Sequence, residues 1–311
     1  MSGERRTAGE TAPARRARGI VLVTISAILW GFSGSCGEML SQNCGVPVEW
    51  VVVQRLVWSA VILAVAALIF DRRNCAALLK DRTSVIRLIC YGVFGVICCQ
   101  WFYQEVIAWT NAGTGTLMEQ LGLIIVLFVT CLRERRKPVR REMLGLILAL
   151  AGAFIICTQG NLGSLAMAPE GLAWGIAAAI GMALYLLLPV SLLKDHGSFT
   201  VMALAMAVAA LVSIPLFRPW NYTVVLTPEV LFGTAGMTIC GTALAYLLFL
   251  QGVRDTGPVI AGLLDTIELV AAFLISHFWL GTAITVWDAV GAVCIMAMMA
   301  LVTRKDVSAN A

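Results

Sequence analysis

Apolar stretches of about twenty residues follow one another along almost the whole sequence. A helix needs ~20 largely apolar residues to cross ~30 Å of hydrocarbon. By that measure the sequence predicts spanning helices near residues 19–40, 50–70, 86–108, 112–132, 142–159, 170–191, 199–217, 229–251, 257–278 and 285–303. We therefore predict an all-α integral membrane protein with ten transmembrane helices.

Charged residues are too few to cover a water-facing surface. Asp, Glu, Lys and Arg make up 13% of the 311 residues, about half of the ~25% found in soluble domains. The net charge of +4 arises from short basic clusters between the apolar stretches. This composition excludes a soluble enzyme and gives no indication of nucleic-acid binding, so lipid is expected to surround much of the chain.

The basic clusters predict how the chain is oriented in the membrane. If the N-terminus is cytoplasmic, 20 of the 22 Lys and Arg fall in cytoplasmic segments. The exceptions are Arg55, inside a predicted helix, and Arg218. The positive-inside rule then places both termini of a multi-pass protein on the cytoplasmic side of the cytoplasmic membrane. Residues 1–18, which are polar and rich in arginine, are expected to form a disordered tail, and residues 304–311 a second tail.

Two parts of the sequence resemble each other. Residues 112–148 and 257–296 match at an offset of about 145–147 residues, each with a Gly-containing helix start followed by acidic or amide residues. Five helices per repeat is an odd number, so the second repeat must enter the membrane from the opposite side. We therefore predict two inverted five-helix repeats, at residues 19–159 and 170–303, with a site at their interface.

Several motifs resemble one known transporter family. The run TGPVIAGLLDTIELVAAFLISHFWLG (256–281) is similar to the second signature of EamA-type transporters in the drug/metabolite transporter superfamily. The run ILWGFSGS (28–35) resembles the Leu-Trp-Gly of that family's first helix, and Arg55 matches an arginine of its second. Where the family has Glu-Pro, this sequence has Glu268-Leu269 and Leu121-Gly122. The resemblance implies a bacterial-type carrier in the cytoplasmic membrane that exports amino acids or related metabolites, with protons as a candidate coupling ion.

Ionisable and amide side chains inside predicted helices are the first candidates for a binding site. Arg55, Glu119, Gln120, Asp265 and Glu268 lie within apolar stretches, where a charge costs about 2.5–3.5 kcal/mol on insertion scales. Arg55 and Glu119 are expected at similar depth and close enough to pair. We predict that the five side chains line a central cavity and contact substrate or protons. The alternative is a structural network in which Arg55 neutralises Glu119 while Glu268 stays protonated or bonds a neighbouring helix.

Aromatic residues are the second group of candidates. Trp30, Tyr103, Tyr185 and Tyr246 lie inside predicted helices and are assigned to the cavity wall. Trp and Tyr also anchor helices at membrane interfaces, which is the alternative. Glu38 lies near the end of the first helix and is expected at the solvated interface.

No motif indicates catalysis or nucleotide hydrolysis. The sequence has no nucleophile elbow, zinc-protease motif, Walker motif or Cys/His spacing for a metal, so we expect no enzyme, cofactor or metal site. The prediction is a secondary active transporter whose partners are a small-molecule substrate and the lipid bilayer. A channel, a non-transporting membrane scaffold and a membrane-embedded enzyme are the alternatives. Nothing in the sequence indicates an oligomeric state.

Overall fold

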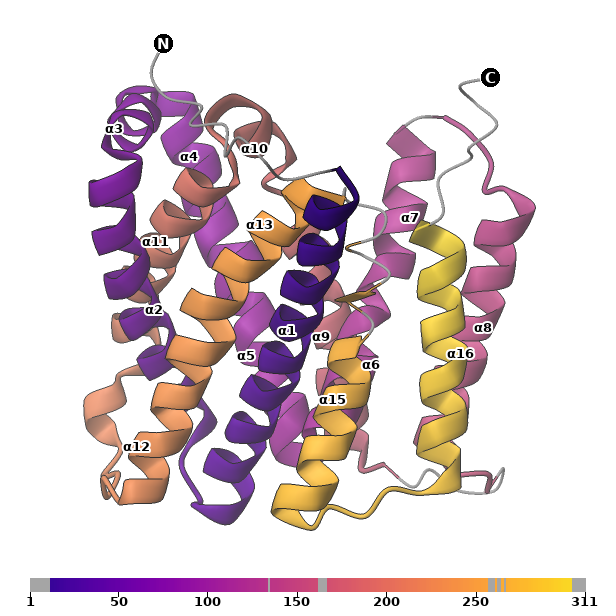
Figure 1. The fold of residues 1–311 in the computed structure, drawn as a ribbon. Coiled ribbons are helices and arrows are strands. Elements are labelled where there is room, and N and C mark those ends of the chain that lie inside the picture. Colours follow the sequence, from indigo (N-terminus) through magenta and orange to yellow (C-terminus); the bar gives the residue numbers. More distant parts are fainter. Residues whose placement is uncertain are drawn as a thin grey trace.

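The fold is a bundle of helices that run roughly side by side (Figure 1). The computed structural model describes residues 12–133, 135–161, 167–256, 261, 264–265 and 267–303. No strand occurs among these residues. Residues 304–311, where the second tail is predicted, lie outside them.

The first half of the chain contains the helical elements α1 (Ala12–Glu38), η1 (Met39–Asn43), α2 (Val48–Phe70), α3 (Arg72–Lys80), α4 (Arg82–Cys90), η2 (Tyr91–Ile97), α5 (Cys98–Trp109), α6 (Ala112–Gln120), α7 (Gly122–Arg133) and α8 (Arg140–Thr158). The second half contains α9 (Pro169–Leu187), α10 (Val190–His196), α11 (Ser198–Phe217), η3 (Pro219–Asn221), α12 (Pro228–Ala235), η4 (Gly236–Leu244), α13 (Ala245–Thr256), α15 (Ile267–Ile275), η5 (Ser276–Leu280) and α16 (Val286–Thr303).

The helices confirm the prediction of an all-α membrane fold. Seven continuous helical runs in the described part of the chain are long and apolar enough to cross a membrane. Three shorter apolar helices follow the same pattern, at Glu142–Ile156, Ile267–Leu280 and Val286–Met298. Nine of the predicted spans coincide with one of these helices. The predicted span 257–278 does so from Ile267 onward, while residues 257–260, 262–263 and 266 lie outside the described residues. The count of ten crossings stays a prediction.

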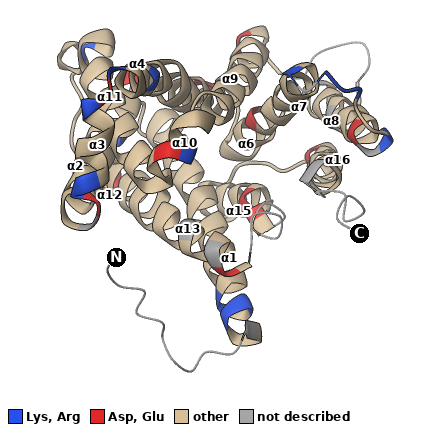
Figure 2. Ribbon diagram, turned by 90° about the horizontal axis from the view of Figure 1, so that it is seen from above, with Lys and Arg blue, Asp and Glu red and all other residues tan. Residues whose placement is uncertain are grey.

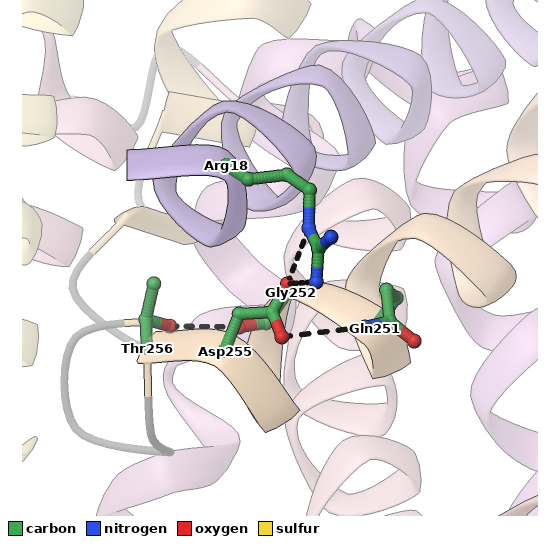
Figure 3. A network of polar contacts seen from close by, with 5 residues as sticks. All are labelled: Arg18, Gln251, Gly252, Asp255 and Thr256. Carbon is green, nitrogen blue, oxygen red and sulfur yellow. Dashed lines mark hydrogen bonds and ion pairs between the residues drawn. The ribbon is translucent and has the colours of Figure 1, made fainter. Parts of the chain in front are cut away.

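The first helix begins earlier than expected. α1 starts at Ala12, so residues 12–18 of the expected tail are helical. Arg18, the last of these residues, binds Asp255 of α13, with Nε 3.0 Å and Nη2 2.9 Å from Oδ2 (Figure 3). Asp255 also accepts a hydrogen bond from Gln251 at 3.3 Å. The ion pair extends α1 because it holds the helix against α13 beyond the apolar stretch.

The two halves of the chain run through the bundle in opposite directions. α1 runs from the upper to the lower end of Figure 1, and α9 runs the other way, to where α10 follows it. α1 packs along α13 and α15 of the second half, and α9 packs along α5, α6 and α7 of the first. α2 packs against α11, and α8 against α16. This exchange of partners is what an inverted repeat produces, because a twofold axis maps each half onto the other.

Departures from regular α-helix also occur at matching places. The wide-turn π-helical segments η2 and η4 directly precede α5 and α13, the third long helix of each half. A turn at Leu121 separates α6 from α7, although no proline is present there. Such interruptions expose backbone groups and are tolerated at membrane depth only where they face protein or a cavity.

Basic side chains collect at one end of the bundle. Figure 2, seen from the upper end of Figure 1, shows Lys and Arg at the start of α1, around α3 and α4, and near the turn from α7 to α8. We call this the basic end and the opposite one the far end. The basic end is the one that the positive-inside rule places in the cytoplasm.

The close contact between α1 and α13 gives a stability prediction. A Cβ atom at Gly252 would lie 2.4 Å from Val23 Cγ2 and 3.0 Å from the Gly19 carbonyl oxygen. We expect Gly252→Ala to destabilise the protein by about 1–3 kcal/mol because the helices must move apart. In a thermal-unfolding double-mutant cycle, adding Val23→Ala should recover part of the loss. Purely additive effects of the two substitutions would contradict this packing.

Candidate functional site

A cavity of about 290 Å³ lies in the middle of the bundle, between the two halves. Its walls come from α1, α2, α5, α6, α9, α13 and residues 265–268. All nine predicted site residues line this central cavity: Trp30, Arg55, Tyr103, Glu119, Gln120, Tyr185, Tyr246, Asp265 and Glu268. The structure therefore brings together side chains that are up to 238 positions apart in the sequence, from Trp30 to Glu268. Their role in binding stays a prediction.

Several polar atoms of the cavity have no protein partner. Arg55 Nε, Ser33 Oγ and Asp265 Oδ1 are buried and make no hydrogen bond within the described part of the chain. Buried polar groups in proteins are almost always hydrogen-bonded, since leaving one without a partner costs about 1–3 kcal/mol. A polar ligand with both an acceptor and a donor would satisfy these atoms.

The expected pairing of Arg55 with Glu119 is not formed. The carboxylate of Glu119 instead accepts a hydrogen bond from the thiol of Cys99, at 3.1 Å. Among the described residues, no ion pair within 4.0 Å joins Arg55 to a carboxylate. A direct Arg55–Glu119 ion pair, which was the structural alternative, is therefore absent, and the guanidinium has hydrogen-bonding capacity for another group.

The break at Leu121 places two of the site residues at the end of a helix. Glu119 and Gln120 are the last residues of α6. The C-terminal end of a helix carries partial negative charge from its unpaired carbonyl groups, which favours a nearby cation. With the carboxylates of Asp265 and Glu268, this part of the cavity suits an ammonium group, while Arg55 on α2 suits a carboxylate.

Aromatic rings form much of the remaining wall. The rings of Trp30 and Tyr246 meet edge to face at 5.3 Å, and Trp30 also contacts Phe249 at 5.0 Å. The hydroxyl groups of Tyr185 and Tyr246 lie 2.6 Å apart. Tyr103 binds Thr116 at 3.0 Å. All four aromatic residues predicted for the cavity thus lie in its wall, away from the membrane interface.

Hydrogen bonds hold the far-end part of α1 to both halves of the chain. The carboxylate of Glu38 accepts bonds from the backbone N–H of Ala112 at 2.8 Å and from the hydroxyls of Ser276 and Thr282 at 2.7 and 2.5 Å. Ala112 belongs to the first half of the chain and the two hydroxyls to the second. Glu38 is 1% exposed. The expectation of a solvated Glu38 is therefore wrong, because donors from both halves surround its carboxylate.

Two glutamines continue these contacts. The amide of Gln104 donates to the Gly37 carbonyl at 2.9 Å. The amide of Gln42 donates to the carbonyls of Ile107 and Thr110, both at 2.8 Å. We call the bonds made by Glu38, Gln42 and Gln104 the far-end ladder. They fasten α1 and η1 to α5, α6 and the segment after α15.

The two halves of the chain each resemble one known protein family. The sequence pattern of the EamA-like transporter family matches residues 17–158 and matches a second time at residues 169–304. The chain belongs to the EamA-like transporter family. The doubled match agrees with the exchanged helix contacts of the two halves.

Individual relatives are similar over nearly their whole length. The chain is 26% identical over 286 residues to a Salmonella typhimurium protein named uncharacterized inner membrane transporter YicL, covering 92% of this chain and 95% of that protein. It is 21% identical over 297 residues to the Bacillus subtilis protein named uncharacterized transporter YwfM, covering 94% and 96%. A solved crystal structure with 15% identity superposes with a TM-score of 0.57 over 93% of this chain and 95% of that one, which shows a common fold.

Some cavity residues of this EamA-like transporter escaped sequence reasoning. Ser33 and Cys99 carry no charge and resemble packing residues when read alone. Helical spacing would have found both, because Ser33 lies three positions after Trp30 and Cys99 four positions before Tyr103. Residues at these spacings share a helix face.

One cluster at the basic end contains the three residue types of a hydrolytic triad, but its hydrogen bonds connect them differently. Ser84 Oγ lies 3.2 Å from His196 Nε2 and donates to Asp81 at 2.6 Å. In a triad the aspartate binds the histidine, which can then take the proton of the serine. Here Asp81 caps α4, and hydrogen bonds from the Ser84 hydroxyl and amide hold the pKa of Asp81 below its usual value. The cluster is therefore a helix cap.

The far-end ladder gives the second prediction. Glu38→Gln replaces one carboxylate oxygen by an N–H₂ group, which cannot accept the hydrogen bonds that the surrounding N–H and O–H groups donate to Glu38. We expect a loss of about 1–3 kcal/mol in stability, because buried donors lose their acceptor. Thermal unfolding of the detergent-purified protein measures this, with Glu170→Gln in the exposed first turn of α9 as the control. Equal melting temperatures for the two variants would contradict a closed ladder.

Proposed function

We propose that this EamA-like transporter is a secondary carrier that exports a small zwitterionic metabolite, an amino acid or a related compound, by alternating access. The observation that carries the proposal is the central cavity between the two halves, which has Arg55 on α2 and three carboxylates on α6 and residues 265–268. An α-carboxylate and an α-ammonium group are the complementary charges. Transporters with inverted repeats place their substrates at such an interface.

The far-end ladder supports a direction for the cycle. With the basic end in the cytoplasm, a solute would enter the cavity from that side while the far-end ladder is intact. Alternating access then requires α1 to separate from α5, α6 and the segment after α15 as the basic end closes. The ladder joins the two halves, so breaking it is coupled to their relative movement.

Buried carboxylates support proton coupling. Glu119, Asp265 and Glu268 share one cavity, and chains of Asp and Glu form proton relays in membrane transporters. We assign Glu268 as the group that exchanges a proton when the substrate's ammonium group leaves. Protonation there would remove a negative charge that otherwise holds the substrate.

The assignment of Arg55 can be tested by binding. We expect Arg55→Gln to weaken binding of neutral amino acids by about 10- to 150-fold, since a hydrogen bond to a charged group contributes ~1.5–3 kcal/mol. Calorimetric titration of detergent-purified protein measures the dissociation constants. Arg218→Gln, which removes a positive charge at the far end of α11, is the control and should leave them unchanged. An unchanged affinity in Arg55→Gln would exclude this carboxylate site.

Proton coupling can be tested in proteoliposomes. Wild-type transport of the bound amino acid should be saturable, show counterflow and respond to an imposed pH gradient. Glu268→Gln should keep counterflow and lose the response to the gradient, because the site can no longer release a proton. A Glu268→Gln response equal to that of the wild type would contradict the assignment. Transport without saturation or counterflow would indicate a channel.

A further inference from the structure

A second cavity adjoins the first on the side of the basic end. It has a volume of about 170 Å³ and lies among α2, η2, α9, α10, α11 and α13. Tyr185, Leu186, Tyr246 and Phe249 line both cavities, so the two share a wall. We call the second one the apolar cavity.

The lining of the apolar cavity contains no charged side chain. Its walls are aliphatic and aromatic, with Phe199 and Met202 of α11 facing Tyr91 of η2 across the same space. The hydroxyls of Tyr185 and Tyr246 lie 2.6 Å apart and hydrogen-bond each other. An apolar cavity of about 150 Å³ in another protein stays dry and binds benzene. This cavity therefore has the size and chemistry for an apolar group as large as an aromatic ring.

The two cavities on either side of the common wall differ in their chemistry. One has buried Arg55, Asp265 and Ser33 atoms without protein partners, and the other is lined mainly by aliphatic and aromatic side chains and by no charged group. A molecule with a charged end and an apolar end can reach both if the Tyr185 and Tyr246 rings turn aside. Such a movement breaks the hydrogen bond between the two hydroxyls and the longer contact of Tyr185 with the Met202 sulfur at 3.9 Å.

We propose that the apolar cavity is a second substrate subsite, which binds the hydrophobic side chain of an amino acid whose charged groups are held in the central cavity. The inference rests on the proposed function and makes it more specific: the preferred substrates are neutral amino acids with large apolar side chains. Affinity then increases with side-chain length, because each methylene leaves water for the apolar cavity. The expected gain is about fourfold for each methylene.

The test is a straight-chain ligand series with constant charged groups: glycine, alanine, 2-aminobutyrate, norvaline and norleucine. Binding to the full-length protein is measured by calorimetry. Met202→Trp fills the apolar cavity without adding a residue to the central one. In this variant we expect glycine and alanine to bind as in the wild type, while norleucine loses at least tenfold. Leu211→Trp is the matched control, since Leu211 is on the same helix and 72% exposed.

A second variant covers a failure of Met202→Trp to fold. Met202→Ala enlarges the apolar cavity, and tryptophan should then gain affinity relative to norvaline.

Equal affinities across the wild-type series, or a length dependence that survives Met202→Trp, would overturn the second subsite while leaving the carrier in place. If indole binds, depends on Met202 and does not compete with norleucine, the cavity is an independent lipid-like site and the inference is also wrong. If no member of the series binds the wild-type protein, both the proposed amino-acid function and the second subsite are wrong.

Discussion

Hydrocarbon offers no partner for a hydrogen bond, and the architecture follows from this constraint. Every backbone group at membrane depth must be satisfied within the protein, so the described chain is helical. The interruptions at η2, at η4 and at Leu121 are confined to helices that surround the central cavity or the apolar cavity. Ionisable side chains obey the same constraint, which explains why Arg55 and three carboxylates are gathered in one interior space.

The two cavities and the far-end ladder divide the interior into zones of different chemistry. Nearest the basic end the walls are apolar, the middle is charged, and the far end is closed by neutral and acidic hydrogen-bonding groups. A solute that crosses the protein would meet these zones in turn. In the proposed export cycle, its apolar part would leave water first and its charges would be matched before the far end opens, so that neither is exposed to lipid.

Sequence alone predicted most of the fold because spans and buried charges are strong signals in an apolar chain. Arg55, Glu119 and Glu268 stand out for that reason, and the structure places all three in one cavity. The buried position of Glu38 could not be predicted, since its donors come from residues 112, 276 and 282, and only the folded chain brings them together. The helix break at Leu121 was equally hidden, because no proline marks it.

The far-end ladder relies largely on atoms that every residue possesses. Gln104 binds the carbonyl of Gly37, Gln42 binds two further carbonyls, and Glu38 accepts from a backbone amide. Most side chains along these helices can therefore change over evolutionary time without loosening these contacts, provided that Glu38, Gln42 and Gln104, the two hydroxyls that bind Glu38, and the helix path persist. A ladder of this kind tolerates sequence drift, so the residues that line the interior can vary while the contact between the two halves stays the same.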